Sequence, residues 1–301
     1  MAGIVLFGYS DVGFVCLDHL LTNGYDVRLV VTHEDDPGEA KWFRSVAKRA
    51  REAGVETLTS EIKDGPEVEA RVAAAAPDLI LSCYYRRMIP SRILAHAKRG
   101  AFNMHGSLLP RYRGRAPVNW AVLNGETEVG VTLHHMVKRA DAGDIVDAEA
   151  VPVGSDETAY EAMTNVVEAA RKVLARQIEA LLAGTAPRAA QDESRATYFG
   201  GRKPEDGRID WSWPTARIVN LVRAVAEPFP GAFSDAGDRR LFVWRARAVA
   251  GAGLPGTLLS AGPRPVVAAG DGAVELLRWS WGDGPRVESG ALGLAAGTRI
   301  G

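Results

Sequence analysis

The sequence predicts an α/β protein in which a doubly wound parallel sheet is followed by a smaller β domain. The first half of the chain alternates short β-branched runs with amphipathic stretches, which is typical of strands and helices in a parallel sheet. A polar Gly/Pro-rich stretch then follows a long helical pattern and has the composition of a linker. The remainder contains short strand-like runs separated by Gly and Pro, which favours a small antiparallel barrel or sandwich.

Periodicity places the elements of the first half. Apolar and β-branched runs predict strands over 3–9, 25–33, 78–84, 99–106 and 128–136. Helices are expected after the first strand and over 40–54, 68–76 and 158–182. Gly54 is expected to close the helix over 40–54 as its C-cap. Because parallel sheets bind ligands at the carboxyl ends of their strands, polar residues at strand ends are the first candidates for a site.

Composition divides the chain into domains. Residues 1–188 are expected to form the α/β domain, 189–204 a linker and 205–301 the second domain. In the second domain we expect a helix over 215–226 and strands over 239–249, 256–261, 265–270 and 273–280.

Charge and cysteine content exclude several classes of protein. The 301 residues carry a formal net charge of -1, which argues against a broad basic face for nucleic acid. The two cysteines, Cys16 and Cys83, cannot build a disulfide framework or a cysteine-rich zinc site. The N-terminus has the pattern of a buried strand and not of a signal peptide, and no apolar run is long enough to cross a bilayer. We therefore expect a cytoplasmic protein without membrane contact.

The first strand leads into "FGYSDVG", which contains Gly8 and Gly13. Ser10 stands at the second glycine position of a dinucleotide-binding motif, and His33 stands where an acidic residue would end the second strand. The stretch therefore predicts a tight strand-to-helix turn and not a nicotinamide site.

Asn103 and His105 flank Met104 in the strand over 99–106, so their side chains share one face. An amide N–H can bind a developing oxyanion, and an imidazole can move protons near neutral pH. The pair indicates acyl chemistry, although a strand end that caps the following loop would carry the same residues.

Asp141 and Asp144 follow the strand over 128–136, and a carboxylate beside a histidine favours the imidazolium form. Nothing in the context of Ser107 or Cys16 marks either as an activated nucleophile. The nucleophile is therefore expected to belong to the substrate.

Two other groups carry weaker signals. His134 and His135 face opposite sides of a strand and do not predict a metal site, since zinc needs three convergent ligands. Arg111, Arg113 and Arg115 can hold carboxylates or phosphates, or can belong to a solvated loop.

Taken together, these motifs resemble those of the formyltransferases that use N10-formyltetrahydrofolate. That family carries Asn-x-His on a strand, a Ser-Leu-Leu-Pro loop and a downstream Asp, which correspond here to Asn103 and His105, residues 107–110 and Asp141. The likeness continues through 24–39, 82–90, 198–211 and 221–234 and so covers essentially the whole chain.

The resemblance implies a Rossmann-like N-terminal domain and a C-terminal domain similar to an OB fold. It also implies that Asn103 stabilises an oxyanion, that His105 is the proton donor, and that Asp141 holds His105 and raises its pKa. N10-formyltetrahydrofolate, as co-substrate and without a metal, would then contact Arg87, Met88, Ile89, Arg115 and the backbone of Val137, Lys138, Arg139, Ala140 and Asp141.

Within the family, "YYRRMI" and "VKRADAG" are closest to the formyltransferase domain of the bifunctional UDP-4-amino-4-deoxy-L-arabinose formyltransferase and UDP-glucuronate decarboxylase of polymyxin resistance. This likeness implies UDP-4-amino-4-deoxy-L-arabinose as acceptor, in lipid A modification. That enzyme continues into a decarboxylase domain, whereas this sequence ends at Gly301. A homo-oligomer and an association with a decarboxylase domain both stay open.

Other acceptors and activities also stay open. A methionyl-tRNA formyltransferase needs basic loops, whereas residues 32–43 hold four acidic residues and one Lys. Further candidate acceptors are another amino sugar and N-hydroxyornithine. If the protein is a hydrolase, the acceptor is water. A non-catalytic folate-binding protein would have no need of Asn103, His105 and Asp141 together.

Overall fold

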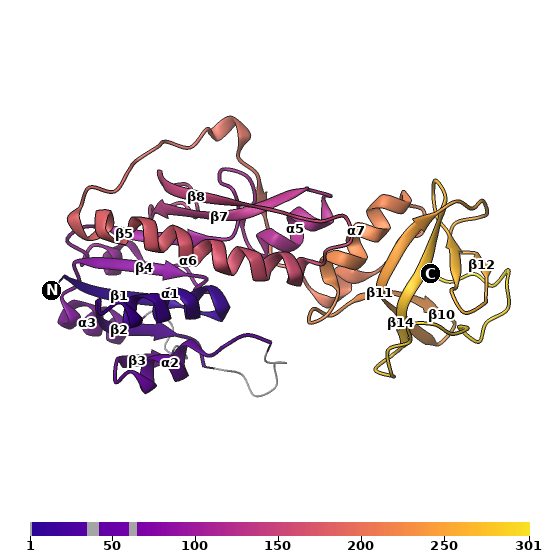
Figure 1. Cartoon of the computed structure of the whole chain (residues 1–301), viewed down its shortest axis with the longest axis horizontal. Helices are drawn as coiled ribbons and strands as arrows, with labels where there is room; N and C mark the ends of the chain where they lie inside the picture. The colour runs from indigo at the N-terminus through magenta and orange to yellow at the C-terminus, as the bar shows by residue number, and fades with distance from the viewer. Residues whose placement is uncertain (1, 35–41, 60–64) are drawn as a thin grey trace. The chain divides into compact units, whose positions relative to one another are not determined.

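The computed structural model describes residues 2–34, 42–59 and 65–301 (Figure 1). They form two compact units that interleave along the chain. The first unit contains Met1–Pro117, Val129–Val151 and Thr164–Gly200, and the second contains Val118–Glu128, Pro152–Met163 and Gly201–Gly301.

A seven-stranded sheet in the order β3-β2-β1-β4-β5-β7-β8 forms the centre of the first unit. Its strands β1 to β5 pair in parallel, which confirms the predicted Rossmann-like arrangement. The strands are β1 (Gly3–Gly8), β2 (Asp26–Thr32), β3 (Glu56–Thr59), β4 (Leu79–Cys83), β5 (Ala101–His105), β7 (Glu128–His135) and β8 (Ile145–Pro152).

One edge of this sheet departs from the prediction, because β7 runs antiparallel to β5. A parallel crossover needs a helix that packs back onto the sheet. The chain between β5 and β7 offers only the short α5 (Pro117–Leu123), most of which belongs to the second unit. The sheet is therefore mixed, with the expected parallel strands β1 to β5 and an antiparallel edge that the strand–helix alternation did not indicate.

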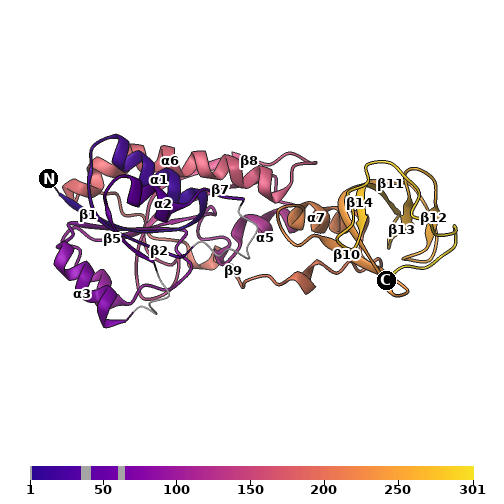
Figure 2. The same cartoon turned by 90° about the horizontal axis from the view of Figure 1, so that it is seen from below.

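Helices cover both faces of the sheet. Figure 2 shows α1 (Ser10–Thr22), α2 (Val46–Glu52) and α6 (Ala159–Ala183) on one face and α3 (Pro66–Ala75) on the other. The predicted helix over 40–54 has its first two residues outside the described part of the chain and is helical from Val46. Gly54 follows it with a φ of 71°, as expected of a residue that closes a helix.

The core on the α3 face shows why these segments fold in this way. Alternate residues of β1 and β2 point to the same side and meet α3 and the short α4 (Ser91–Leu94). Full burial of one aliphatic or aromatic side chain stabilises the folded protein by roughly 1.5–3 kcal/mol relative to leaving that side chain exposed. The cluster comprises Val5, Phe7, Leu29, Val31, Val68, Val72, Ile80, Ile89, Ile93 and Ala101.

The second unit has a five-stranded antiparallel sheet in the order β10-β11-β14-β13-β12, as predicted for a smaller β domain. The core of this unit contains Trp211 and Phe233, whose side chains are each 4% exposed. Within it, the Trp211 indole N–H donates to the Ser234 hydroxyl at 2.9 Å. Within Gly201–Gly301, its α-helix and strands are α7 (Thr215–Val225), β10 (Ala232–Ala236), β11 (Arg239–Val249), β12 (Leu258–Ser260), β13 (Val266–Ala268) and β14 (Ala273–Trp281).

Part of the segment predicted as a linker is structured. It contains a 3-10 helix at Glu193–Arg195 and the strand β9 (Tyr198–Phe199), which pairs with β6 (Arg113–Gly114) in parallel. A second 3-10 helix follows at Pro204–Gly207. Across the described residues, no helix combines the length and the apolar character that crossing a bilayer requires.

The turn from β1 into α1 gives a first prediction. A Cβ on Gly13 would lie 2.9 Å from the carbonyl carbon of Gly8, so Gly13→Ala must displace backbone. We expect a loss of about 1–3 kcal/mol in unfolding free energy, measured by urea denaturation. Gly200→Ala is the control, since a Cβ there meets no atom within 4 Å. Equal stability of the two variants would contradict the tight turn.

Candidate active site

The candidate site lies at the carboxyl end of β5, where three polar side chains of two strands come together. Asn103 and His105 point to the same face of β5, as the sequence predicts. Antiparallel pairing sets His134 of β7 directly opposite Asn103. His105 is 6% exposed and His134 is 2% exposed, so both imidazoles are largely removed from water.

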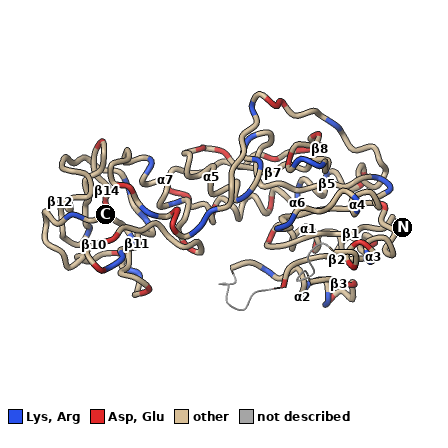
Figure 3. Tube along the Cα trace, turned by 180° about the vertical axis from the view of Figure 1, so that it is seen from behind, with Lys and Arg blue, Asp and Glu red and all other residues tan. Residues whose placement is uncertain are grey.

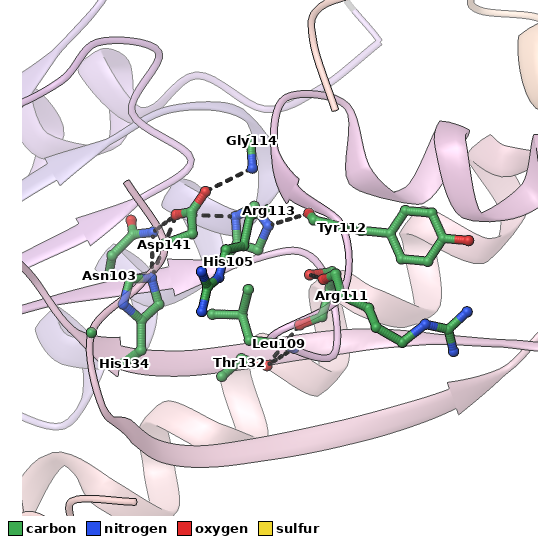
Figure 4. A network of polar contacts seen from close by, with 12 residues as sticks. Asn103, His105, Leu109, Arg111, Tyr112, Arg113, Gly114, Thr132, His134 and Asp141 are labelled. Carbon is green, nitrogen blue, oxygen red and sulfur yellow. Dashed lines mark hydrogen bonds and ion pairs between the residues drawn. The ribbon is translucent and has the colours of Figure 1, made fainter. Parts of the chain in front are cut away.

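The Asp141 carboxylate forms the centre of this group (Figure 4). Its Oδ1 lies 3.4 Å from Asn103 Nδ2, 3.5 Å from His105 Nδ1 and 3.6 Å from His134 Nε2. Its Oδ2 accepts the backbone N–H of Gly114 at 2.8 Å. The structure therefore brings together the three residues expected from the sequence and adds His134 to them.

The sequence did not predict His134 as part of this site, because the pair of His134 and His135 suggests only a metal ligand. Its Nδ1–H donates to the carbonyl of His135 at 2.8 Å, so Nε2 of the neutral ring can accept a hydrogen bond. Asn103 Nδ2 lies 3.1 Å away and donates to it. The signal that would have revealed His134 is the antiparallel register of β5 and β7, which is not visible in either strand alone.

The orientation of His105 is fixed by the loop that follows β5. Its Nε2–H donates to the carbonyl of Tyr112 at 2.9 Å. In the neutral ring Nδ1 is then unprotonated and faces Asp141. Tyr112 has a φ of 58°, and its ring stacks on Phe199 with centroids 5.0 Å apart. Nδ1 is therefore the atom of His105 that can take up a proton.

Burial decides the protonation state of His105. Desolvation lowers its pKa below the usual value for histidine, and electrostatic interactions with His134 and Arg113 lower it further. The Asp141 carboxylate and the hydrogen bond to Tyr112 act in the opposite direction but are outweighed. Asp141 therefore raises the pKa of His105, as expected, but burial keeps that pKa below the usual value for histidine.

Asp141 itself is an anion at neutral pH. Burial raises its pKa, but electrostatic interaction with His105, the His134 side chain and the Gly114 N–H outweigh this effect and lower the pKa to about 2. A permanent carboxylate thus lies beside a neutral imidazole. Protonation of His105 creates an ion pair at this position, which is the arrangement that a proton carrier needs.

The three arginines after β5 have different environments. Arg113 is fully buried and donates to Gln191 Oε1 at 2.7 Å and to Glu193 Oε1 at 2.6 Å. Its guanidinium is thus satisfied by protein groups and cannot serve as a ligand-binding arginine. Arg111 and Arg115 are exposed.

The remaining polar candidates lie away from the reaction chemistry. Asp144 pairs with Arg188 at 3.1 Å. The Ser107 hydroxyl donates to the carbonyl of Arg111 at 2.7 Å. Hydrogen bonding to Cys16 and burial raise the pKa of the Cys83 thiol, which disfavours a thiolate nucleophile.

The residues expected to contact folate lie on the loops after β4 and β7. Met88 is 58% exposed and Val137 is 43% exposed, so both present apolar surface to solvent. Ile89, in contrast, is 5% exposed within the core of the α3 face and can offer a ligand only its main chain. Of the others, Arg87, Arg115, Lys138 and Arg139 are exposed, and Ala140 is half-buried.

No three His, Cys, Asp or Glu side chains form a cluster suited to a metal ion within residues 2–34, 42–59 and 65–301.

Comparison with known proteins relates this geometry to a family. Residues 3–178 match the family described as formyl transferase, and residues 202–291 match the family of its C-terminal domain. The chain is similar to an N-formyltransferase from Helicobacter canadensis, solved with folinic acid and dTDP-3-aminofucose, at 19% identity and a TM-score of 0.70. That match covers 92% of this chain and 99% of the other.

Two further solved structures are similar over most of their length. One is WlaRD, described as a sugar 3N-formyl transferase, with 19% identity, a TM-score of 0.72 and coverage of 98% of this chain and 99% of that one. The other is a methionyl-tRNA formyltransferase from Clostridium thermocellum, with 20% identity, a TM-score of 0.57 and coverage of 83% and 94%. At these identities the structural likeness establishes the fold.

The contact between Asp141 and His105 gives a second prediction. Asp141→Asn removes a negative charge 3.5 Å from Nδ1, so the pKa of His105 should fall below its wild-type value. NMR titration of the His105 ring protons measures this shift. Asp147→Asn is the control, because that carboxylate pairs with Arg176 at 3.0 Å. A His105 pKa that is unchanged or higher in Asp141→Asn would show that the carboxylate does not act on this ring.

Proposed function

Because the chain belongs to the formyl transferase family, we propose that it moves a formyl group from N10-formyltetrahydrofolate to the amine of a nucleotide-linked amino sugar. The observation that carries this proposal is the convergence of Asn103, His105 and His134 on the Asp141 carboxylate. The group contains an amide donor, a neutral base and an anion that favours the protonated base, and these suit acyl transfer.

In the proposed reaction one bond between carbon and nitrogen forms and another breaks. The acceptor nitrogen attacks the formyl carbon, a new C–N bond forms, and the carbonyl electron pair moves onto oxygen. When this tetrahedral intermediate collapses, the bond between the carbon and N10 breaks. The acceptor nitrogen loses one proton and N10 gains one, so the transfer is redox-neutral and needs one proton carrier.

Asn103 is suited to stabilise the tetrahedral oxyanion. One of its amide hydrogens is held by His134 at 3.1 Å. The other is directed to Asp141 at 3.4 Å, which is long for a hydrogen bond. An oxyanion on this side can accept the second hydrogen in place of Asp141, while the first hydrogen keeps the amide in position.

His105 is suited to carry the proton. Its lowered pKa leaves Nδ1 free to accept a proton from the attacking amine. The imidazolium that forms is stabilised by Asp141, and it can return the proton to N10 as the C–N10 bond breaks. The same residue is thus base in the first half of the reaction and acid in the second.

The loops beside this group support a folate site. Met88 and Val137 offer exposed apolar surface for a flat heterocycle, while Arg87, Arg115, Lys138 and Arg139 offer cations for the glutamate of the donor. Main-chain groups of Ile89, Ala140 and Asp141 complete the contacts that we propose. The assignment of these residues to folate rests on the family motifs.

For the acceptor we propose UDP-4-amino-4-deoxy-L-arabinose, in lipid A modification in the cytoplasm. The motifs "YYRRMI" and "VKRADAG" support this choice. Two similar structures also support it: an N-formyltransferase in complex with dTDP-3-aminofucose and a sugar 3N-formyl transferase. Methionyl-tRNA is the second candidate, since one similar structure has that activity. Figure 3 shows both signs of charge interspersed along the described trace, whereas tRNA favours continuous basic surface.

Release of tetrahydrofolate from N10-formyltetrahydrofolate tests the proposal. We expect release that depends on UDP-4-amino-4-deoxy-L-arabinose, followed by absorbance. dTDP-linked amino sugars, methionyl-tRNA, N-hydroxyornithine and buffer alone are the parallel acceptors. Turnover with only another amine would replace the proposed acceptor, and turnover in buffer alone would indicate a hydrolase.

The roles of His105 and Asn103 give a third prediction. His105→Ala should lower kcat/KM by roughly 10²–10⁴, and Asn103→Ala by about 10²–10³, because a proton carrier and an oxyanion donor are lost. Binding of 5-formyltetrahydrofolate, measured by calorimetry, should persist in both variants. His19→Ala, on the outer helix α1, controls for the loss of an imidazole. Near-normal turnover of His105→Ala would remove that residue from the mechanism.

A further inference from the structure

We propose that Arg113 and Gln191 are positioning residues for the candidate reaction: buried Arg113 fixes Gln191, and Gln191 holds the Asp141 loop so that the carboxylate stays beside His105. Neither residue contacts the reacting atoms in this account. The inference rests on the proposed function for its catalytic consequence, but its structural claim can be tested without turnover.

The Arg113 guanidinium is enclosed by three side chains from the segment that follows α6. It donates to Gln191 Oε1 from Nε at 3.2 Å and from Nη2 at 2.7 Å. It also donates to both carboxylate oxygens of Glu193, at 2.6 and 3.2 Å, and to the Tyr198 hydroxyl. Because a buried guanidinium must be fully hydrogen-bonded, these contacts fix the segment from 191 to 198 against β6.

Gln191 transmits this constraint to the site. While its Oε1 accepts from Arg113, its Nε2 donates to the carbonyl of Asp141 at 2.9 Å and to the carbonyl of Gly143 at 2.6 Å. The amide is therefore a bridge with its acceptor end on Arg113 and its donor end on the loop. Each end has one chemical role, so a substitution can break one end and keep the other.

The Asp141 loop needs such a constraint. Asp141 has a φ of 53°, a left-handed conformation that surrounding contacts must hold in a residue other than glycine. Gly114 N–H fixes the carboxylate at Oδ2, while Gln191 fixes the main chain of the same residue. Gly114 follows Arg113 in β6, so both constraints originate from one two-residue strand.

The charged and titratable groups that face His105 are Asp141, His134 and Arg113. Movement of the Asp141 loop would change the distance between His105 and the Asp141 carboxylate, which is the one carboxylate in this set. His134 would remain fixed in β7. The pKa of His105 is therefore a direct report on the position of the loop.

The test uses two substitutions of Gln191 in the full chain. Gln191→Leu removes both ends of the bridge. Gln191→Glu keeps an acceptor for Arg113 but places an oxygen against the carbonyls of Asp141 and Gly143. Gln177→Leu is the matched control, since the Gln177 side-chain amide donates to Asp147 in β8 at 3.0 Å.

The readouts are the His105 pKa by NMR titration and the kinetics of formyl transfer. Both Gln191 variants should lower the pKa of His105, in the direction predicted for Asp141→Asn, and lower kcat by about ten- to a hundredfold with a smaller change in KM. For Gln191→Glu, the direction of the pKa shift separates two explanations. A displaced Asp141 loop lowers the pKa of His105, whereas an added negative charge acting only at long range would raise it.

An unchanged or raised His105 pKa in both folded Gln191 variants would overturn the proposal. The same holds if Gln177→Leu shifts that pKa equally. If the wild-type protein transfers no formyl group to any acceptor, the proposed function fails, whereas the titration still decides whether Arg113 and Gln191 position Asp141.

Discussion

The carboxylate of Asp141 is the constraint on which the site depends. It is 12% exposed, lies in a left-handed turn, and has three nitrogen-bearing side chains around one of its oxygens. An uncompensated carboxylate at this depth would be costly, so its low pKa reflects how many groups favour the anion. Because each neighbour also has a second partner in the protein, the geometry of Asn103, His105 and His134 follows from where this one charge is held.

The direction of β7 determines how Asp141 reaches this site. Since β7 is antiparallel to β5, the loop after β7 does not emerge beside the residues that follow β5. It must turn back to bring Asp141 to Asn103, and contacts from 191–199 and β6 hold it there. A segment with linker composition thus supports the site, which explains why a fully buried arginine stands in a Pro- and Arg-rich loop.

Alternation along β5 was enough to predict that Asn103 and His105 share a face, and strand–helix alternation predicted the parallel core. His134, the buried state of Arg113 and the core position of Ile89 could not be predicted, because each depends on pairing between distant segments. The family motif indicates that Asp141 raises the pKa of His105, but it does not reveal the burial that lowers this pKa further than the carboxylate raises it. Domain boundaries at 188 and 204, the folate contacts and the acceptor stay predictions.

The most direct test of the central claim follows the carbon that is transferred. With a ¹³C-labelled formyl group on N10-formyltetrahydrofolate and UDP-4-amino-4-deoxy-L-arabinose as acceptor, carbon NMR identifies the product in which the label appears. If the group around Asp141 carries out acyl transfer to an amine, the label appears as a formamide on the sugar nitrogen and tetrahydrofolate forms in equal amount. Label recovered only as formate, or left on the donor with every amine offered, would contradict the account.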